Sequence, residues 1–286
     1  MNRIVVGMDG SAHADWALRW AVREADIRSA AIELVHGYVL HPHALMIGRS
    51  DRDVANDLMD AIIERNRSLL NSVEWDATLV PLLGGAATAL IDVGEDADLI
   101  VVGSRGVGGF GGLFLGTTSY RTAAHASTPV AVIRDGDDGD TRDGTSALIV
   151  GVDDSRGSRR ALRWALDEAE RRNVGLSVVH GYHEPSHPAL ATVGTPEHLE
   201  QLHTRAYDQA IAVVDDVIDA VDVPTKVEVK RIITAGSPAG VLLDNAGADH
   251  LLVVGTRGRG ALGRAVFGSV SHQCLHHAVG PMVVVP

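Results

Sequence analysis

The feature that most constrains the fold of this chain is an internal repeat. Residues 4–11 return as residues 148–155, an offset of 144, and later segments match at an offset of 152. Chance does not give matches at two consistent offsets, so we interpret the repeat as a duplicated domain whose second copy holds eight more residues. The other matching pairs are 17–21 with 161–165, 35–38 with 179–182, and 101–106 with 253–258.

The segment between the two copies differs in composition from both. Residues 135–146 are rich in Asp, Gly and Thr and lack hydrophobic periodicity, which predicts a linker. We therefore expect a first domain at 1–134 and a second at 147–286. Each has an ordinary size for a compact domain.

Charge and cysteine content argue against several classes of protein. The formal net charge is −12 and no long basic run is present, which argues against general binding to nucleic acids or anionic membranes. Cys274 is the one cysteine of the sequence, which excludes an internal disulfide framework. The first apolar stretch ends at Asp9, too early for a signal peptide, and no segment approaches the roughly 18 apolar residues of a membrane span. We expect a soluble, cytoplasmic protein.

Each half alternates apolar strands with amphipathic helices, a pattern typical of a parallel sheet with right-handed crossovers. Ser11 and Ser155 are placed to cap the first helix of each half. We predict an α/β fold of two tandem doubly wound (Rossmann-like) domains, each with a five-stranded parallel sheet in the order 3-2-1-4-5. The expected strands are 4–8, 31–36, 99–102 and 130–133 in the first half, and 148–152, 175–180, 226–230, 251–254 and 282–285 in the second.

Two further features of this pattern matter for the site. The helix after the second strand is expected to bury Val54, Leu58, Ile62 and Leu69 in the first half, and Leu202, Ala206, Ile211 and Val214 in the second. In the predicted order the sheet changes direction between strands 1 and 4. A ligand is therefore expected outside the carboxyl ends of those strands.

A glycine-rich loop follows the fourth strand in both halves and fits the pattern G-x2-G-x9-G-S/T. Glycines let backbone N–H groups approach an anion, and the last glycine opens a helix whose positive end favours phosphate. A mobile surface loop is the alternative, but the motif glycines recur in both copies. No lysine follows the last glycine, so the loop is not a P-loop. The motif residues are Gly103, Gly106, Gly116 and Thr117, and then Gly255, Gly258, Gly268 and Ser269.

Asp9 and Asp153 end the first strand of each half, across the switch point from this loop. Such a carboxylate can accept a hydrogen bond from an adenine amino group or a ribose hydroxyl, or help to hold Mg²⁺. An aspartate that caps a helix or shapes a turn is the alternative interpretation.

Together these residues resemble the universal stress protein family, in particular its ATP-binding members with two tandem domains. The resemblance rests on the V-G-x-D-x-S opening, the Val-His pair that ends strand two, and the glycine loop. It implies a nucleotide-dependent regulator of stress response or growth rather than a dedicated enzyme, with domains that pair through their fifth strands. His125-Ala126 with Pro129, and His277-Ala278 with Pro281, complete the resemblance.

The resemblance implies that the first two strands hold adenine and ribose and that the glycine loop holds the phosphates. The implied ligand is ATP, at two sites per chain, and Mg²⁺ could accompany it. The first site would comprise Gly7, Asp9, Gly37, Gly103, Ser104, Arg105, Gly106, Val107, Gly108, Gly109, Gly116, Thr117, Thr118 and Ser119. The second would comprise Gly151, Asp153, Gly181, Gly255, Thr256, Arg257, Gly258, Arg259, Gly260, Ala261, Gly268, Ser269, Val270 and Ser271.

Three positions depart from the family's pattern. Thr118 replaces the small apolar residue that Val270 keeps. His250 stands where Asp98 precedes strand four, and Arg264 has no counterpart in the first loop. The two sites are therefore expected to differ, with the second the more cationic.

Other functions stay open at this point. A slow ATPase or an autophosphorylating enzyme is the main rival, because related folds host adenylyl transfer. A zinc site is the second, and an interaction module without nucleotide binding is the third. His36 and His180 are interpreted as structural histidines. The signalling partner is unknown, and a homodimer of the whole chain stays open. The zinc interpretation rests on His272, Cys274, His276 and His277, which no nearby carboxylate completes.

Overall fold

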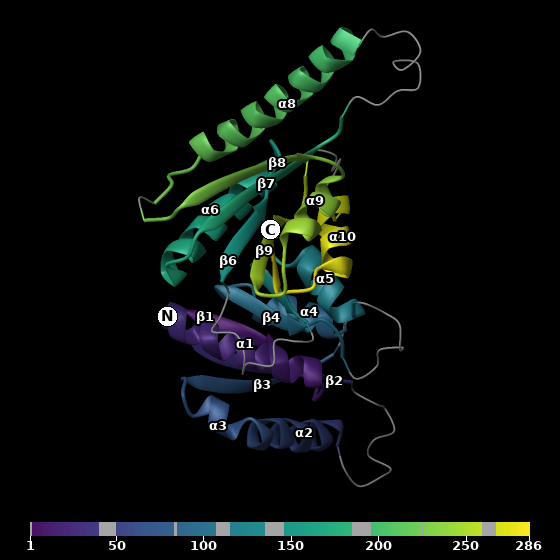
Figure 1. The fold of residues 1–286 in the computed structure, drawn as a ribbon. Helices are drawn as coiled ribbons and strands as arrows, with labels where there is room; N and C mark the ends of the chain where they lie inside the picture. Colours follow the sequence, from purple (N-terminus) through teal and green to yellow (C-terminus); the bar gives the residue numbers. More distant parts are fainter. Residues whose placement is uncertain are drawn as a thin grey trace. The chain divides into compact units, whose positions relative to one another are not determined.

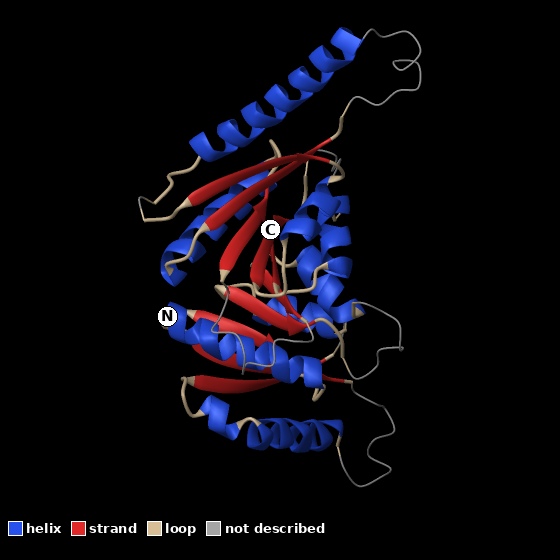
Figure 2. Ribbon diagram, in the orientation of Figure 1, coloured by secondary structure: helices blue, strands red, loops and turns tan. Residues whose placement is uncertain are grey.

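The computed structural model describes the chain in two compact units. The described residues are 2–39, 50–82, 85–106, 115–134, 146–184, 196–224, 226–258 and 267–286. One unit comprises Met1–Thr145 with Val279–Pro286, and the other comprises Ser146–Ala278. Each unit is an α/β domain in which helices flank a sheet, as Figures 1 and 2 show.

The first unit has the predicted strand order. Its strands follow β3-β2-β1-β4-β5, and neighbours within this series are parallel. The predicted order 3-2-1-4-5 is therefore confirmed in this unit. Its elements are β1 (Arg3–Gly7), α1 (Ala12–Arg28), β2 (Ala31–Tyr38), α2 (Asp51–Arg65), α3 (Arg67–Leu70), β3 (Trp75–Pro81), α4 (Ala86–Val93), β4 (Leu99–Gly103), α5 (Thr117–His125) and β5 (Val130–Ile133).

The second unit repeats this arrangement in its first four strands. They follow the order β8-β7-β6-β9 and are parallel, as predicted. Its elements are β6 (Ala147–Gly151), α6 (Arg156–Arg172), β7 (Leu176–Tyr182), α8 (Pro196–Asp219), β8 (Val229–Ala235), α9 (Pro238–Asn245), β9 (His250–Gly255) and α10 (Ser269–His277).

Helices cover both faces of each sheet. In the first unit α3 contacts α1 and α2, whereas α4 contacts α5. In the second unit α6 contacts α8, and α9 contacts α10. Right-handed crossovers toward opposite edges of a sheet put helices on opposite faces, which produces these two layers. The central strands β1 and β4 are buried on both sides, which explains their continuous apolar sequences.

The last strand of the chain, β10 (Met282–Val285), pairs with β5 in antiparallel orientation and completes the sheet of the first unit. Val130 lies opposite Val284, and Val132 lies opposite Met282. An apolar edge strand such as β5 would otherwise offer unpaired backbone groups to other chains. The predicted pairing of the two fifth strands is therefore present.

Two predicted details of the elements are wrong. The strand expected at 226–230 is instead β8, which begins at Val229 and pairs with all of β7 up to Ala235, opposite Tyr182. Pairing with β7 sets the bounds of β8. The alternating residues that precede Val229 include a turn instead of belonging to the strand. The expected burial of Val54 is also wrong, because α2 turns Ala55, Met59 and Ile62 inward and leaves Val54 exposed.

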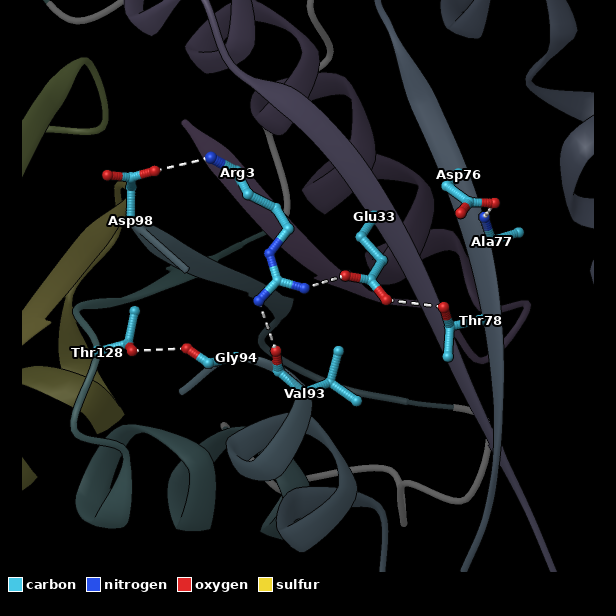
Figure 3. A network of polar contacts seen from close by, with 9 residues as sticks. All are labelled: Arg3, Glu33, Asp76, Ala77, Thr78, Val93, Gly94, Asp98 and Thr128. Atoms are coloured by element: carbon cyan, nitrogen blue, oxygen red, sulfur yellow. Dashed lines mark hydrogen bonds and ion pairs between the residues drawn. The ribbon is translucent and has the colours of Figure 1, made fainter. Parts of the chain in front are cut away.

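A polar network ties together the amino ends of the strands in the first unit (Figure 3). The Arg3 guanidinium donates to Glu33 on β2 and, at 3.0 Å, to the carbonyl of Val93 where α4 ends. The Arg3 amide donates to Asp98 Oδ2 at 2.7 Å, and Thr78 on β3 donates to Glu33. In the second unit His250 replaces Asp98 and accepts from the Gly247 amide instead. This network stabilises the end of the sheet where the strands begin, opposite the carboxyl ends.

Candidate functional site

Each unit holds a cavity at the carboxyl ends of its first, second and fourth strands. This is the switch point at which a ligand was predicted. The first cavity measures about 460 Å³ and the second about 640 Å³. Predicted residues on the first are Gly7, Asp9, Gly37, Gly103, Arg105, Gly106, Gly116, Thr117, Thr118 and Ser119. On the second they are Gly151, Asp153, Gly181, Gly255, Arg257, Gly258, Gly268, Ser269, Val270 and Ser271.

The remaining predicted residues do not line the cavities or lie outside the described residues. Ser104 and Thr256 are buried, and the backbone carbonyl of each accepts a hydrogen bond from the glycine that starts the next helix. The predicted Val107, Gly108, Gly109, Arg259, Gly260 and Ala261, and also Arg264, lie outside the described residues.

The aspartate of each unit lies at the switch point, between the turn that follows the first strand and the glycine that follows the fourth. Asp9 Oδ1 accepts the Ser11 amide at 3.0 Å, and Ser11 in turn caps α1 by accepting from the Ala14 amide. The other carboxylate oxygen lies 2.3 Å from where a β-carbon on Gly106 would stand. Asp153 repeats both features, with its Oδ1 at 3.0 Å from the Ser155 amide and its Oδ2 at 2.6 Å from that position on Gly258. A β-carbon at either glycine would therefore push the opposing carboxylate out of this position.

The helices α5 and α10 begin at the cavity without a side-chain cap among the described residues. Gly116 and Gly268 are their N-caps, whereas serines cap α1, α2, α6 and α9. The first amides of an uncapped helix have no partner within the helix and form a site that favours anions. Arg105 and Arg257 add a positive charge beside these amides.

Two hydrogen bonds fix each of these helix ends to the preceding strand. The Gly116 amide donates to the Ser104 carbonyl at 2.7 Å, and Ser119 Oγ donates to the Gly103 carbonyl at 2.6 Å. In the second unit the Gly268 amide and Ser271 Oγ make the equivalent bonds, at 2.9 and 2.6 Å. The uncapped amides are thus held in a fixed position next to the cavity.

Some lining residues were not predicted. Ala86, Ala89 and Leu90 on α4 cover the first cavity, and Pro238 and Leu242 on α9 cover the second. The match of Leu90 with Leu242 at the offset of 152 could have revealed them. His36 and His180 also line the cavities, although sequence alone suggested a purely structural role.

The two cavities differ in the side chains around the shared residues. Tyr182, His183, Phe267 and His272 line the second cavity. Leu115 takes the place of Phe267 in the first, and the tyrosine equivalent to Tyr182 does not line it. The ring of Tyr182 lies 6.0 Å from that of Tyr207 on α8. The second cavity is therefore the more aromatic and holds more imidazoles.

Among the described residues, no group of three His, Cys, Asp or Glu side chains is placed to hold a metal ion. Cys274 is fully buried, and burial raises the pKa of its thiol to about 12. His272 and His276 lie with their rings 4.6 Å apart. In the part of the chain that is described, no helix is long and apolar enough to cross a membrane.

The fold and the paired cavities define a tandem α/β protein with a Rossmann-like sheet and a ligand-sized cavity in each unit. The chain belongs to the universal stress protein family, whose sequence profile matches residues 1–134 and 145–286. This agrees with the resemblance found from the motifs.

Relatives with similar sequences match over nearly the whole chain. A universal stress protein of Mycolicibacterium smegmatis is 31% identical and covers 99% of this chain and 96% of its own. One of Mycobacterium tuberculosis is 29% identical over 98% of this chain and 95% of its own. The crystal structure of a universal stress protein from Archaeoglobus fulgidus matches with a TM-score of 0.68 at 18% identity, covering 99% and 98% of the two chains. It shows the shared fold.

Proposed function

We propose that this protein is an ATP-binding regulator with one nucleotide site in each unit. The observation that carries the proposal is the pair of uncapped helix ends, α5 and α10, which open onto the cavities beside Arg105 and Arg257. Fixed amides and a guanidinium are donors suited to a phosphate chain. Each cavity has the volume of a small-molecule site.

The nucleoside would occupy the opposite side of each cavity. Gly7 and Gly37 lie near the carboxyl ends of β1 and β2 there, and Asp9 presents a carboxylate that can accept from a ribose hydroxyl or an adenine amino group. Gly151, Gly181 and Asp153 give the second cavity the same wall. The aspartates could also help to hold Mg²⁺ that accompanies the triphosphate.

We further propose that the protein acts by binding rather than by turnover. The curated relatives carry the name universal stress protein, which supports a role in stress response or growth control. The nucleotide state would then be read by a signalling partner whose identity stays open, and a homodimer of the chain is compatible with this role. A cytoplasmic location stays a prediction from the sequence.

Mass spectrometry of the nucleotide that co-purifies with the chain tests the ligand. ATP is expected, and calorimetry with added Mg·ATP should give two sites per chain after the nucleotide is removed. Protein that purifies without nucleotide and shows no heat of ATP binding would favour an interaction module instead.

The rival enzyme function is tested by turnover. Purified chain with saturating Mg·ATP should release phosphate more slowly than about 1 s⁻¹, the lower end of ordinary enzyme rates. Faster hydrolysis that is lost in the Asp9→Asn/Asp153→Asn double variant would overturn the regulator proposal.

A further inference from the structure

His36 and His180 make the same unusual contact in the two units. His36 Nδ1 lies 2.7 Å from the carbonyl oxygen of Met8, and His180 Nδ1 lies 2.8 Å from that of Val152. A carbonyl oxygen accepts, so Nδ1–H of each ring is the donor. Met8 and Val152 directly precede Asp9 and Asp153, so each bond joins the end of the second strand to the start of the aspartate turn.

This bond lies where the first strand leaves the sheet. The Met8 amide still donates to the Val35 carbonyl at 2.8 Å, as the Val152 amide does to Val179 at 3.0 Å. Beyond that point the chain enters a turn in which Gly10 has a φ of 82°. The Met8 carbonyl belongs to the peptide group that continues into Asp9. Because a peptide group is planar, holding this carbonyl also holds the Asp9 amide and restricts the direction of the Asp9 side chain.

We propose that His36 and His180 are positioning residues, which hold Asp9 and Asp153 in the orientation that the nucleotide needs. The proposal rests on the proposed function, in which these aspartates contact the ligand. It assigns a ligand-related role to two histidines that sequence alone marked as structural. The repeat supplies an internal comparison, because each histidine should affect the site of its own unit.

Direct contact with the ligand is the competing explanation, because both rings also line their cavities. The two explanations use different nitrogens of the ring. Positioning needs the donor at Nδ1, whereas ligand contact would use Nε2. An asparagine amide nitrogen can stand in for Nδ1, and the longer glutamine can stand in for Nε2, so the two substitutions separate the explanations.

The experiment measures ATP binding by calorimetry for His36→Leu, His36→Asn and His36→Gln. Each variant also carries Gly258→Ala, which is expected to weaken the second site, so that the heat of tight binding comes from the first site. His36→Leu and His36→Gln should bind at least about fivefold more weakly, the effect of one lost hydrogen bond. His36→Asn should recover most of the lost affinity. His203→Leu, at an exposed position on α8, is the matched control and should bind like the parent.

Two outcomes overturn the proposal. His36→Gln binding normally while His36→Asn is defective would show direct ligand contact. All three variants binding like the parent would show that the histidine has no influence on the site. A double-mutant cycle adds a further check: His36→Leu should weaken binding much less in an Asp9→Asn background, because both changes act through one side chain.

A readout without ligand keeps the proposal separate from the proposed function. The Ser11 amide donates to Asp9 Oδ1, so its hydrogen exchange reports whether the aspartate is in place. Exchange at Ser11 should accelerate in His36→Leu and slow again in His36→Asn, with unchanged melting temperature. Unchanged exchange in His36→Leu would contradict the positioning role even if no nucleotide binds. Absence of ATP binding in the parent, with the exchange pattern intact, would instead contradict the proposed function.

Discussion

Asp9 Oδ2 occupies the space that a β-carbon on Gly106 would need, and Asp153 does the same to Gly258, with separations of 2.3 and 2.6 Å. Real β-carbons do not approach other atoms this closely. At the scale of single residues, the aspartate and the glycine of each site are therefore matched in shape. The carboxylate that follows the first strand fits against the backbone of a glycine, which has no side chain there.

Gly106→Ala should displace the Asp9 carboxylate and weaken ATP binding in the first unit about tenfold, the effect of one lost polar contact of ordinary strength. Gly258→Ala should do the same in the second unit. Gly175→Ala is the matched control, because its β-carbon would meet its nearest neighbour at 3.6 Å. Calorimetry that finds both sites intact in Gly106→Ala would contradict the assigned geometry.

Burial raises the pKa of the Cys274 thiol from 9.0 to about 12, which makes part of the stability depend on pH. Between these values the unfolded chain releases a proton that the folded chain keeps, so stability falls as pH rises above 9.0. Between pH 8 and pH 10 the parent should lose about 1.4 kcal/mol more unfolding free energy than Cys274→Ala does. Urea unfolding at the two pH values measures this difference, and equal losses would contradict it.

At the scale of an element, the helices α1 and α6 contain the same buried Arg–Glu ion pair in both copies of the repeat. Arg28 Nε donates to Glu24 at 3.0 Å near the end of α1, and Arg172 donates to Glu168 at 2.7 Å near the end of α6. The four side chains are at most 7% exposed. A buried pair of this kind is costly to break, because the remaining charge stays buried away from water.

Glu24→Gln should therefore destabilise the first unit by roughly 3 kcal/mol. Hydrogen exchange of the α1 amides in a urea series measures this loss unit by unit. Glu64→Gln, which breaks the exposed pair with Arg67, is the control and should leave exchange in the same unit unchanged. Equal hydrogen exchange of the α1 amides in the two variants would contradict the claim that the buried pair stabilises the unit more than the exposed pair does.

The elements also show how far sequence reasoning reaches. The strands buried on both faces, such as β5 and β10, were predicted with their observed bounds because a continuous apolar run has few alternatives. The bounds of β8 and the inner face of α2 were predicted wrongly, because an edge strand and a half-exposed helix carry mixed patterns that only tertiary packing resolves. The glycines and aspartates of the cavities were found from the repeat. Leu90 and Leu242 were missed because apolar residues on a helix carry no sign of a ligand.

At the scale of the whole molecule, the C-terminal strand belongs by sequence to the second repeat but packs in the first unit. All four residues of β10 are buried. Apolar side chains contribute roughly 1.5–3 kcal/mol each when buried, so this short segment contributes substantially to the stability of the folded chain. The first unit therefore takes its last strand from the sequence of the second repeat.

A chain that ends at Ala278 should leave the β5 edge uncovered. We expect faster hydrogen exchange in β4 and β5 and self-association in light scattering, because an exposed apolar edge pairs with other chains. Val279→Ser, an exposed position in the same segment, is the control that should change neither. A truncated chain with the oligomeric state of the parent and normal exchange would show that β10 is dispensable.

The central claim is that each unit cradles a nucleotide between the aspartate of its first strand and the uncapped helix that follows its fourth. A crystal structure grown with excess Mg·ATP tests it most directly. Phosphates should lie at the amino ends of α5 and α10, with ribose or adenine within hydrogen-bond distance of Asp9 and Asp153. Two empty cavities, or nucleotide bound elsewhere on the chain, would contradict the account.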